Sequence, residues 1–370
     1  MIGTEEKGWL RISFSPGIGR VRLIRLMEAF PSSREALEAG PLGWRDRAGI
    51  PFQVGARLIP ENDEYLQRSL AALDQIGARI ITHLDAETYP PLLKEIYDPP
   101  ALLFARGECD LGNCLAVVGS RRAAGAMNRF TRELCAELAG HGITIVSGAA
   151  RGIDGAAHQG ALDGGGGTVA VLGCGIDRVY PPEHGKLFAR ILETGMLLGE
   201  YPPGAEPLAN HFPARNRIIS GLSRGVLVVE ATTHSGSLIT ADFALQQGRE
   251  VFAVPGPVYS SSGAGVNQLL KDGATLISDS RDLLEILGAS KCIKPAVGTS
   301  SPPSPPLSEK ETVLWRLMVD GPRHLDEIVQ RSGLTPADVS ATLLHLELEG
   351  VVSRLPGMHF IANRKPSWPP

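Results

Sequence analysis

Residues 115–119 read Leu-Ala-Val-Val-Gly, and four comparable apolar runs follow along the chain. These runs are Thr144-Ile-Val-Ser-Gly148, Val169-Ala-Val-Leu-Gly173, Val226-Leu-Val-Val-Glu230 and Val251-Phe-Ala-Val-Pro255. Each run is almost continuously apolar, whereas a strand with one face in water alternates apolar and polar residues. Amphipathic stretches such as residues 130–138 lie between the runs. The pattern predicts an α/β domain with a doubly wound parallel sheet that helices cover on both faces.

The length of the chain predicts more than one domain, because a single core rarely grows beyond roughly 250–300 residues and this chain has 370. Residues 1–80 have a helical pattern and predict a small helical domain, and residues 81–290 hold the predicted sheet. Residues 291–307 are rich in proline and serine and predict a linker. Residues 308–365 predict a winged helix, whose helices are expected at 309–319, 325–332 and 336–349.

The composition is that of a globular chain, with 43% hydrophobic and 21% charged residues. The formal net charge of −4 excludes a broad electropositive surface, so a nucleic-acid site must be a local cluster of cations. Five cysteines without metal-ligand spacing or an evident disulfide set predict a reducing compartment, hence the cytoplasm. We expect no membrane partner, because no stretch approaches the roughly 20 apolar residues of a membrane span.

Candidate binding residues follow or precede the predicted strands, because an open parallel sheet binds ligands outside the carboxyl ends of its strands. Glycine and serine turns at helix N-termini present backbone amides to anions, and arginine forks onto phosphate oxygens. The pattern therefore predicts a phosphate-binding edge of the sheet. Its candidate residues are Gly119, Ser120, Arg121, Arg151, Phe212, Arg215, Asn216, Arg217, Ser235, Gly236 and Ser237.

Cofactor and catalytic motifs are not found. Gly119-Ser-Arg-Arg-Ala-Ala-Gly125 does not fit the dinucleotide fingerprint, and no P-loop is present, so we expect no nucleotide cofactor. The histidines show neither metal-ligand nor catalytic-triad spacing, and Asp154 is interpreted as a structural carboxylate that caps or ion-pairs the following helix. Phe212 lies beside the arginines and either stacks on a base or packs into the core. We therefore expect a binding protein without an enzymatic activity, a cofactor or a metal.

Several motifs together resemble the DNA-processing protein A family, also called DprA or Smf. About 200 residues carry the resemblance, in the family's order. The motifs are Tyr89-Pro-Pro-Leu-Leu93, Asp98-Pro-Pro100, Val118-Gly-Ser-Arg121, Ser147-Gly-Ala-Ala-Arg-Gly-Ile-Asp154 with Ala156-Ala-His158, Val171-Leu-Gly-Cys-Gly-Ile-Asp177 with Tyr180-Pro181, Phe212-Pro-Ala-Arg-Asn-Arg-Ile-Ile-Ser-Gly-Leu-Ser223, Val229-Glu-Ala231, Ser235-Gly-Ser-Leu-Ile-Thr-Ala241 and Val254-Pro-Gly256.

The resemblance implies a cytoplasmic protein that binds and protects incoming single-stranded DNA and loads the RecA recombinase onto it during natural transformation. It also implies an extended Rossmann-like domain that forms a homodimer, and a protein that is not an enzyme. Carried over to this chain, the DNA contacts would come from Arg121 with the amides of Gly119 and Ser120, from residues 215–217 and from the turn at residues 235–237.

This chain departs from the family pattern at two places. Many members continue the first motif as Gly-Ser-Arg-x-x-Ser-x-Tyr-Gly, where this chain has Ala124, Ala126 and Met127, and many have Arg or Lys where it has His234. An alternative is a nucleotide-phosphate-handling enzyme of the lysine-decarboxylase-like, or phosphoribohydrolase, type. Residues 235–242 lack the paired glycines and the aligned catalytic glutamate of that signature, P-G-G-x-G-T-x-x-E.

The flanking segments allow two expectations. Ser15-Pro-Gly-Ile-Gly19 resembles a helix-hairpin-helix turn, and the family has a sterile-alpha-motif-like domain here; the turn either contacts DNA or serves packing and assembly. The predicted third helix of the winged helix carries Asp338, Glu347 and Glu349 and has no Lys or Arg. Because acidic side chains repel phosphates, we expect the winged helix to bind duplex DNA poorly and to serve protein contacts.

Overall fold

The computed structural model describes residues 2–288, 307–319, 321–349, 351–355 and 357–362. The chain divides into two compact units, Met1–Ala296 and Val297–Pro370, which are treated separately below. The predicted linker lies outside the described residues, apart from Leu307. No helix in the described ranges has the length and apolar character of a transmembrane span.

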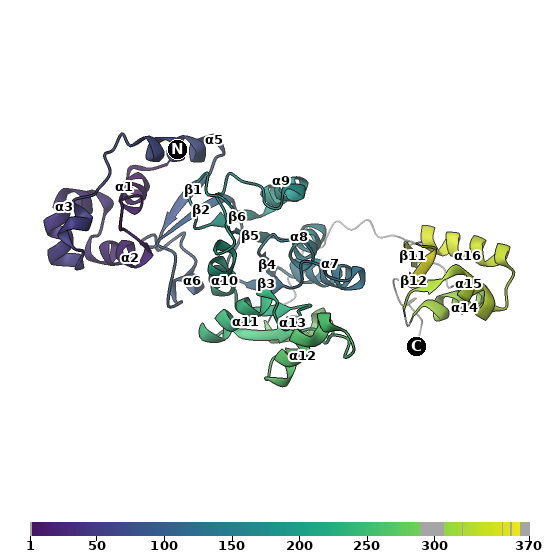
Figure 1. Ribbon diagram of the computed structural model, residues 1–370. Coiled ribbons are helices and arrows are strands. Elements are labelled where there is room, and N and C mark those ends of the chain that lie inside the picture. The colour runs from purple at the N-terminus through teal and green to yellow at the C-terminus, as the bar shows by residue number, and fades with distance from the viewer. Residues whose placement is uncertain (1, 289–306, 320, 350, 356, 363–370) are drawn as a thin grey trace. The chain divides into compact units, whose positions relative to one another are not determined.

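The first unit begins with helices, as predicted. They are α1 (Thr4–Ser13), α2 (Arg20–Ala29), α3 (Ser33–Ala48), α4 (Phe52–Gly55) and α5 (Glu64–Gln75). Their core is built on the fully buried rings of Trp9, Phe30 and Trp44. This core is continuous with that of the first strands of the sheet, and Figure 1 shows α1 and α2 beside that edge. Residues up to 296 form one compact unit, so a domain boundary near residue 80 stays a prediction.

The described strands form one sheet in the order β1-β2-β6-β5-β4-β3-β7-β8-β9. Strands β3 to β9 pair in parallel, and β1 and β2 add an antiparallel edge next to β6. The strands are β1 (Arg79–Thr82), β2 (Leu102–Gly107), β3 (Cys114–Val118), β4 (Thr144–Ser147), β5 (Thr168–Leu172), β6 (Met196–Gly199), β7 (Gly225–Val228), β8 (Glu250–Ala253) and β9 (Thr275–Leu276). All five predicted runs are strands, and the predicted α/β fold is confirmed.

Helices cover both faces of the sheet (Figure 1). Leu134 of α7, Ile153 of α8 and Leu283 of α13 pack on one face, and Ile218 of α10, Ala241 of α11 and Val266 of α12 pack on the other. The α-helices are α6 (Pro91–Lys94), α7 (Gly125–Gly140), α8 (Ile153–Asp163), α9 (Gly185–Thr194), α10 (His211–Gly221), α11 (Gly236–Gln246), α12 (Ala264–Lys271) and α13 (Ser280–Ile286), with 3-10 turns η1 (Pro182–His184) and η2 (Ser261–Gly263).

The direction in which strands are added reverses at β3. The chain proceeds from β3 through β4 and β5 to β6 on one side, and then returns to place β7 against the other side of β3. The loops that follow β3 and β7 therefore diverge, and doubly wound sheets bind their ligands in the crevice between such loops. The topology places the candidate site at this switch point.

The second unit is the predicted winged helix. Its helices are α14 (Glu309–Met318), α15 (Leu325–Ser332) and α16 (Pro336–Leu348), and its sheet has the order β10 (Arg323–His324), β12 (His359–Ala362) and β11 (Val352–Leu355). The unit has its own core, which includes Leu314, Ile328, Leu343 and Phe360.

Candidate nucleic-acid interface

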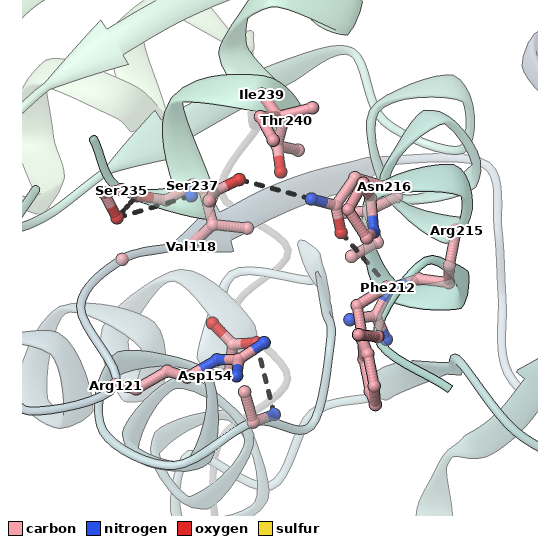
Figure 2. Close-up of a pocket in the computed structure, with 16 residues that line it drawn as sticks. Val118, Arg121, Asp154, Phe212, Arg215, Asn216, Ser235, Ser237, Ile239 and Thr240 are labelled. Carbon is pink, nitrogen blue, oxygen red and sulfur yellow. Dashed lines mark hydrogen bonds between the residues drawn. The ribbon is translucent and has the colours of Figure 1, made fainter. Parts of the chain in front are cut away.

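A cavity of about 370 Å³ lies at the switch point, at the carboxyl ends of the strands (Figure 2). The loops after β3, β4 and β7 surround it together with α10 and the N-terminal turns of α8 and α11. Its lining residues are Val118, Gly119, Arg121, Ala150, Asp154, Ala209, Phe212, Pro213, Arg215, Asn216, Ile219, Ser235, Gly236, Ser237, Ile239 and Thr240. The structure thus brings eight of the predicted residues together in one concave site.

The helix α10 lines the cavity with one face. Phe212, Arg215, Asn216 and Ile219 are spaced i, i+3, i+4 and i+7, which places them along one side of a helix. This helix was not predicted from the sequence, in which residues 212–224 directly precede a predicted strand. Pro213 obscures it, although a proline is tolerated in a first turn, where its missing N–H removes no helical bond.

Arg215 forms the floor of the cavity. Its Nη1 donates to the carbonyl oxygens of Gly148, at 2.9 Å, and Val171, and the residue is only 4% exposed. Burial lowers the pKa of Arg215 to about 10, which leaves it charged at neutral pH. A methyl group on Gly148 would lie 2.6 Å from Nη2 of Arg215, so only glycine allows this close approach. Arg215 is therefore a fixed buried cation of the predicted phosphate-binding edge.

Asp154 contributes the carboxylate of the cavity. It is buried, and its Oδ2 accepts a hydrogen bond from the backbone amide of Ala150 at 3.2 Å. Burial raises the pKa of Asp154, and the nearby Arg215 and Arg121 guanidinium groups oppose that rise. The carboxylate thus holds the loop after β4 and offsets part of the positive charge of the site, so its hydrogen bond is to the preceding loop, whereas the sequence predicted a cap or an ion pair for the following helix.

Phe212 contacts both arginines of the cavity. The Cζ atoms of Arg121 and Arg215 lie 5.6 and 5.9 Å from its ring centroid, within the range of a cation–π contact. Tyr180 is tilted against the same ring, with centroids 5.4 Å apart. A methyl group on Gly173 would lie 2.9 Å from Phe212 Cδ1. Phe212 is half-buried, so the ring both packs on Gly173 and faces the cavity. Tyr180 is not among the residues predicted for the site, although Tyr180 lies shortly after a predicted strand.

The turn after β7 is the N-terminus of α11. The Ser235 hydroxyl accepts from the Ser237 amide at 3.4 Å and lies 2.7 Å from the Ser237 hydroxyl. The Gly236 carbonyl accepts from the Asn216 side-chain amide at 3.3 Å, which joins this turn to α10 (Figure 2). Because the helix dipole places partial positive charge at a helix N-terminus, this wall of the cavity favours an anion.

Ser120, in the loop after β3, ties that loop to its neighbours. Its amide donates to the Glu230 carbonyl at 2.8 Å, and its own carbonyl accepts from the Ile153 amide at 3.2 Å. Its hydroxyl accepts from the Arg122 amide at 3.1 Å. The Ser120 amide is thus engaged within the protein, which contradicts its expected role as a phosphate donor. Gly119 and the exposed Arg121 side chain are the parts of this loop that line the cavity.

Arg217 lies outside the cavity. Its Nη2 donates to both carboxylate oxygens of Glu200, at 2.8 and 2.9 Å, and its Nε lies 3.2 Å from Asp98 Oδ2. Arg20 of α2 contacts the same two carboxylates, at 2.5 Å for Asp98 and 3.8 Å for Glu200. The structure therefore places the buried charge of Arg217 in an ion-pair network and not with the other predicted phosphate-binding residues in the cavity.

Arg151 occupies an intermediate position. It forms an ion pair with Glu183 in which both side chains are about half exposed, and it lines a small depression beside the cavity. That depression shares Arg121, Ala150 and Phe212 with the cavity. Within the described ranges, no group of three or more acidic, histidine or cysteine side chains could hold a metal ion.

Comparison with known proteins gives a consistent family assignment. The family model described as DNA recombination-mediator protein A matches residues 79–288, and a DprA winged helix domain model matches residues 298–358. Protein Smf of Escherichia coli is 40% identical and covers 96% of this chain and 95% of its own length. DNA processing protein DprA of Streptococcus pneumoniae is 46% identical over 54% of this chain and 71% of its own length.

Solved structures agree with the sequence matches. The crystal structure of DNA processing protein A from Streptococcus pneumoniae aligns with a TM-score of 0.67 and 36% identity, and the match covers 77% of this chain and 98% of the other. A structure of the Helicobacter pylori protein, which describes that protein's mode of binding single-stranded DNA, aligns with a TM-score of 0.51 and 31% identity. That match covers 56% of this chain and 95% of the other.

Proposed function

Because the chain belongs to the DNA recombination-mediator protein A family, also called DprA or Smf, we propose that it binds single-stranded DNA in the switch-point cavity. The observation that carries this proposal is the contact of the Phe212 ring with the guanidinium groups of both Arg121 and Arg215. An aromatic ring among cations is the combination that single-strand binding requires, because bases stack on the ring and phosphates contact the cations.

In this proposal one part of the cavity binds phosphate and another part binds a base. Arg121 and the N-terminus of α11 at Gly236 take phosphate oxygens, since one is an exposed cation and the other presents backbone amides. The half-exposed face of Phe212 takes a base. Arg215 adds a fixed positive charge beneath both. A base inside a duplex cannot enter such a cavity without leaving its stack, which favours single strands.

The role in the cell follows from the family. We extend to this chain the protection of incoming DNA in the cytoplasm and the loading of RecA during transformation. We also extend to it the homodimer formed through the Rossmann-like domain. The Helicobacter pylori relative, described as a single-stranded DNA binder, supports the DNA-binding step. In this proposal the protein acts as a binding protein and not as an enzyme.

The test is a comparison of ligands on the full chain. Fluorescence anisotropy with labelled dT20 and with a 20-base-pair duplex, over a series of NaCl concentrations, gives both affinities and their salt dependence. We expect tighter binding of dT20 than of the duplex, with log Kd rising linearly with log salt concentration. Equal affinity for the two ligands would contradict the proposal.

The enzymatic alternative is tested on the same preparation. Incubation with AMP-type nucleotides, followed by chromatography for free base, measures phosphoribohydrolase activity. We expect no release of base above the level of a protein-free control. Release of base together with no binding of dT20 would replace the proposed function by the enzymatic one.

A further inference from the structure

A second cavity, of about 470 Å³, lies between α7 and α8. Residues from α7, from the beginning of α8 and from η1 line it, and all of them are basic, polar or small. They are Asn128, Arg129, Arg132, Gly152, Gly155, Ala156, Gln159 and His184. None of these side chains is acidic. We call this surface the α7–α8 groove.

Small residues on α8 create the groove. A methyl group on Gly160 would lie 2.3 Å from the Arg132 carbonyl oxygen, so the two helices pack with almost no space between their backbones. Gly155 and Ala156, one turn earlier, leave the surface open above them. A methyl group on Gly155 would lie 3.2 Å from the His184 ring, so any larger side chain would occupy this space.

The α7–α8 groove adjoins the switch-point cavity. Asp154 lines the cavity, and the next two residues, Gly155 and Ala156, line the groove. The loop that carries Arg121 crosses between them, because a methyl group on Gly152 would lie 2.2 Å from the Ser120 carbonyl oxygen. An extended chain bound in the cavity therefore needs to pass only over this loop to enter the groove.

The charges around the groove favour an anion. Arg132 and Arg190 share one carboxylate, that of Asp163, at 2.5 and 3.0 Å, so one positive charge of the trio is in excess. The Arg132 side chain is 54% exposed. The Asp163 side chain is 29% exposed, so solvent reaches both members of the pair. Solvent-exposed ion pairs contribute only about 0–1 kcal/mol, so a phosphate can compete with Asp163 for this guanidinium group.

We infer that the α7–α8 groove continues the DNA site and takes the sugar-phosphate backbone of nucleotides next to those in the switch-point cavity. The inference rests on the proposed function. The groove is lined by arginine, polar and small residues and contains no Phe, Tyr or Trp side chain, so its contacts are with the backbone and are independent of sequence. The groove should therefore contribute to the affinity for long strands, which extend beyond the cavity, and not to the affinity for short ones.

The test compares oligonucleotide lengths on the full chain. The affinities for dT5 and dT20 are measured for the wild type, for Arg132→Gln and for the control Arg68→Gln, which removes an exposed arginine of α5 that does not line the groove. We expect Arg132→Gln to weaken dT20 binding about 3- to 10-fold and to lower the salt slope by about 0.7, the value for one phosphate contact with a single strand. Binding of dT5 by Arg132→Gln, and both affinities of Arg68→Gln, should be unchanged.

A second variant tests the groove in case Arg132→Gln disturbs folding. Gln159→Glu places a carboxylate in the groove without touching the α7–α8 ion pair, and it should weaken dT20 binding more than dT5 binding. Unchanged dT20 affinity in both groove variants, or equal losses for dT5 and dT20, would overturn the inference and leave single-strand binding intact. Failure of the wild type to bind dT20 would instead reject the proposed function.

Discussion

Arg215 and Arg217 are two residues apart on α10, and their guanidinium groups lie on opposite faces of that helix. Arg215 reaches the floor of the cavity and the Gly148 carbonyl, and Arg217 reaches Glu200 and Asp98. Successive residues of a helix are rotated by about 100°, so positions i and i+2 cannot face the same site. One arginine therefore belongs to the cavity and the other to the attachment of α10.

Arg217→Met should destabilise the protein without changing its phosphate contacts. The substitution leaves the buried carboxylate of Glu200 with Arg20 as a distant partner at 3.8 Å. Removing one member of a buried ion pair lowers the free energy of unfolding by about 3–5 kcal/mol. Because Arg20 remains near Glu200, we expect a loss near the lower value of this range. Urea unfolding measures the loss. The salt slope of dT20 binding, measured where the variant is folded, should equal that of the wild type, and a reduced slope would show that Arg217 does contact DNA.

Arg121→Ala should have the opposite effects. Arg121 is exposed, so its removal should change the free energy of unfolding by no more than about 0.5 kcal/mol. Binding of dT20 should weaken, and its salt slope should fall by about 0.7 because one phosphate contact is lost. Arg68→Ala, which removes an exposed arginine of α5, is the matched control and should bind as the wild type does. An Arg121→Ala variant with wild-type affinity and slope would remove Arg121 from the site.

The different success of the sequence predictions has physical causes. Strands β3, β4, β5, β7 and β8 carry β-branched residues and are buried on both faces, which leaves a clear pattern. Strand β6 was missed because Met196-Leu-Leu-Gly199 is short and has no β-branched residue. Helix α10 was missed because Pro213 near its start, and glycine and serine near its end, read as loop signals.

The loops that form the site could be predicted from the sequence, but the directions in which their side chains point could not. Topology alone brings the turns after β3 and β7 together, so Arg121 and residues 235–237 could be found from the strand pattern. The separation of Arg215 from Arg217 follows only once α10 is known to be a helix. The partners of Arg217, Asp98 and Glu200, lie 119 and 17 residues away along the chain, and no local signal connects them to it.

Phe212→Leu should separate the packing role of this ring from its stacking role. Leucine keeps an apolar side chain against Gly173 and removes the aromatic face. A base stacked on an aromatic side chain contributes about 1–3 kcal/mol, so the affinity for dT20 should fall by about 5- to 150-fold. Phe212→Tyr keeps the aromatic face and should retain most of the affinity. If the leucine and tyrosine variants bind equally well, Phe212 serves packing alone.

The winged helix should bind duplex DNA poorly. Helix α16 has no Lys or Arg, and its Asp338 is paired with Lys310 of α14 at 3.0 Å. Its His345 lies 2.8 Å from Glu311. A helix without free cations gains nothing from counterion release. A gel shift with residues 297–370, which have their own core, should show no sub-micromolar binding of duplex at physiological salt. Binding at that level would contradict the expected role in protein contacts.

His158 should make the protein sensitive to acid. Burial lowers the pKa of His158 from 6.5 to about 3. Its Nδ1 donates to the Thr168 hydroxyl, which itself donates to the Ile145 carbonyl, and its buried Nε2 has no hydrogen-bond partner among the described residues. Because the unfolded chain binds a proton near pH 6.5 and the folded chain does not, stability is fully present above that pH and falls between pH 6.5 and about 3.

His158→Asn keeps a donor in place of Nδ1 and removes the titration. Urea unfolding at pH 8 and pH 5 should show that the wild type loses about 2 kcal/mol more than the variant. Equal losses would place the protonation of His158 outside the acid response.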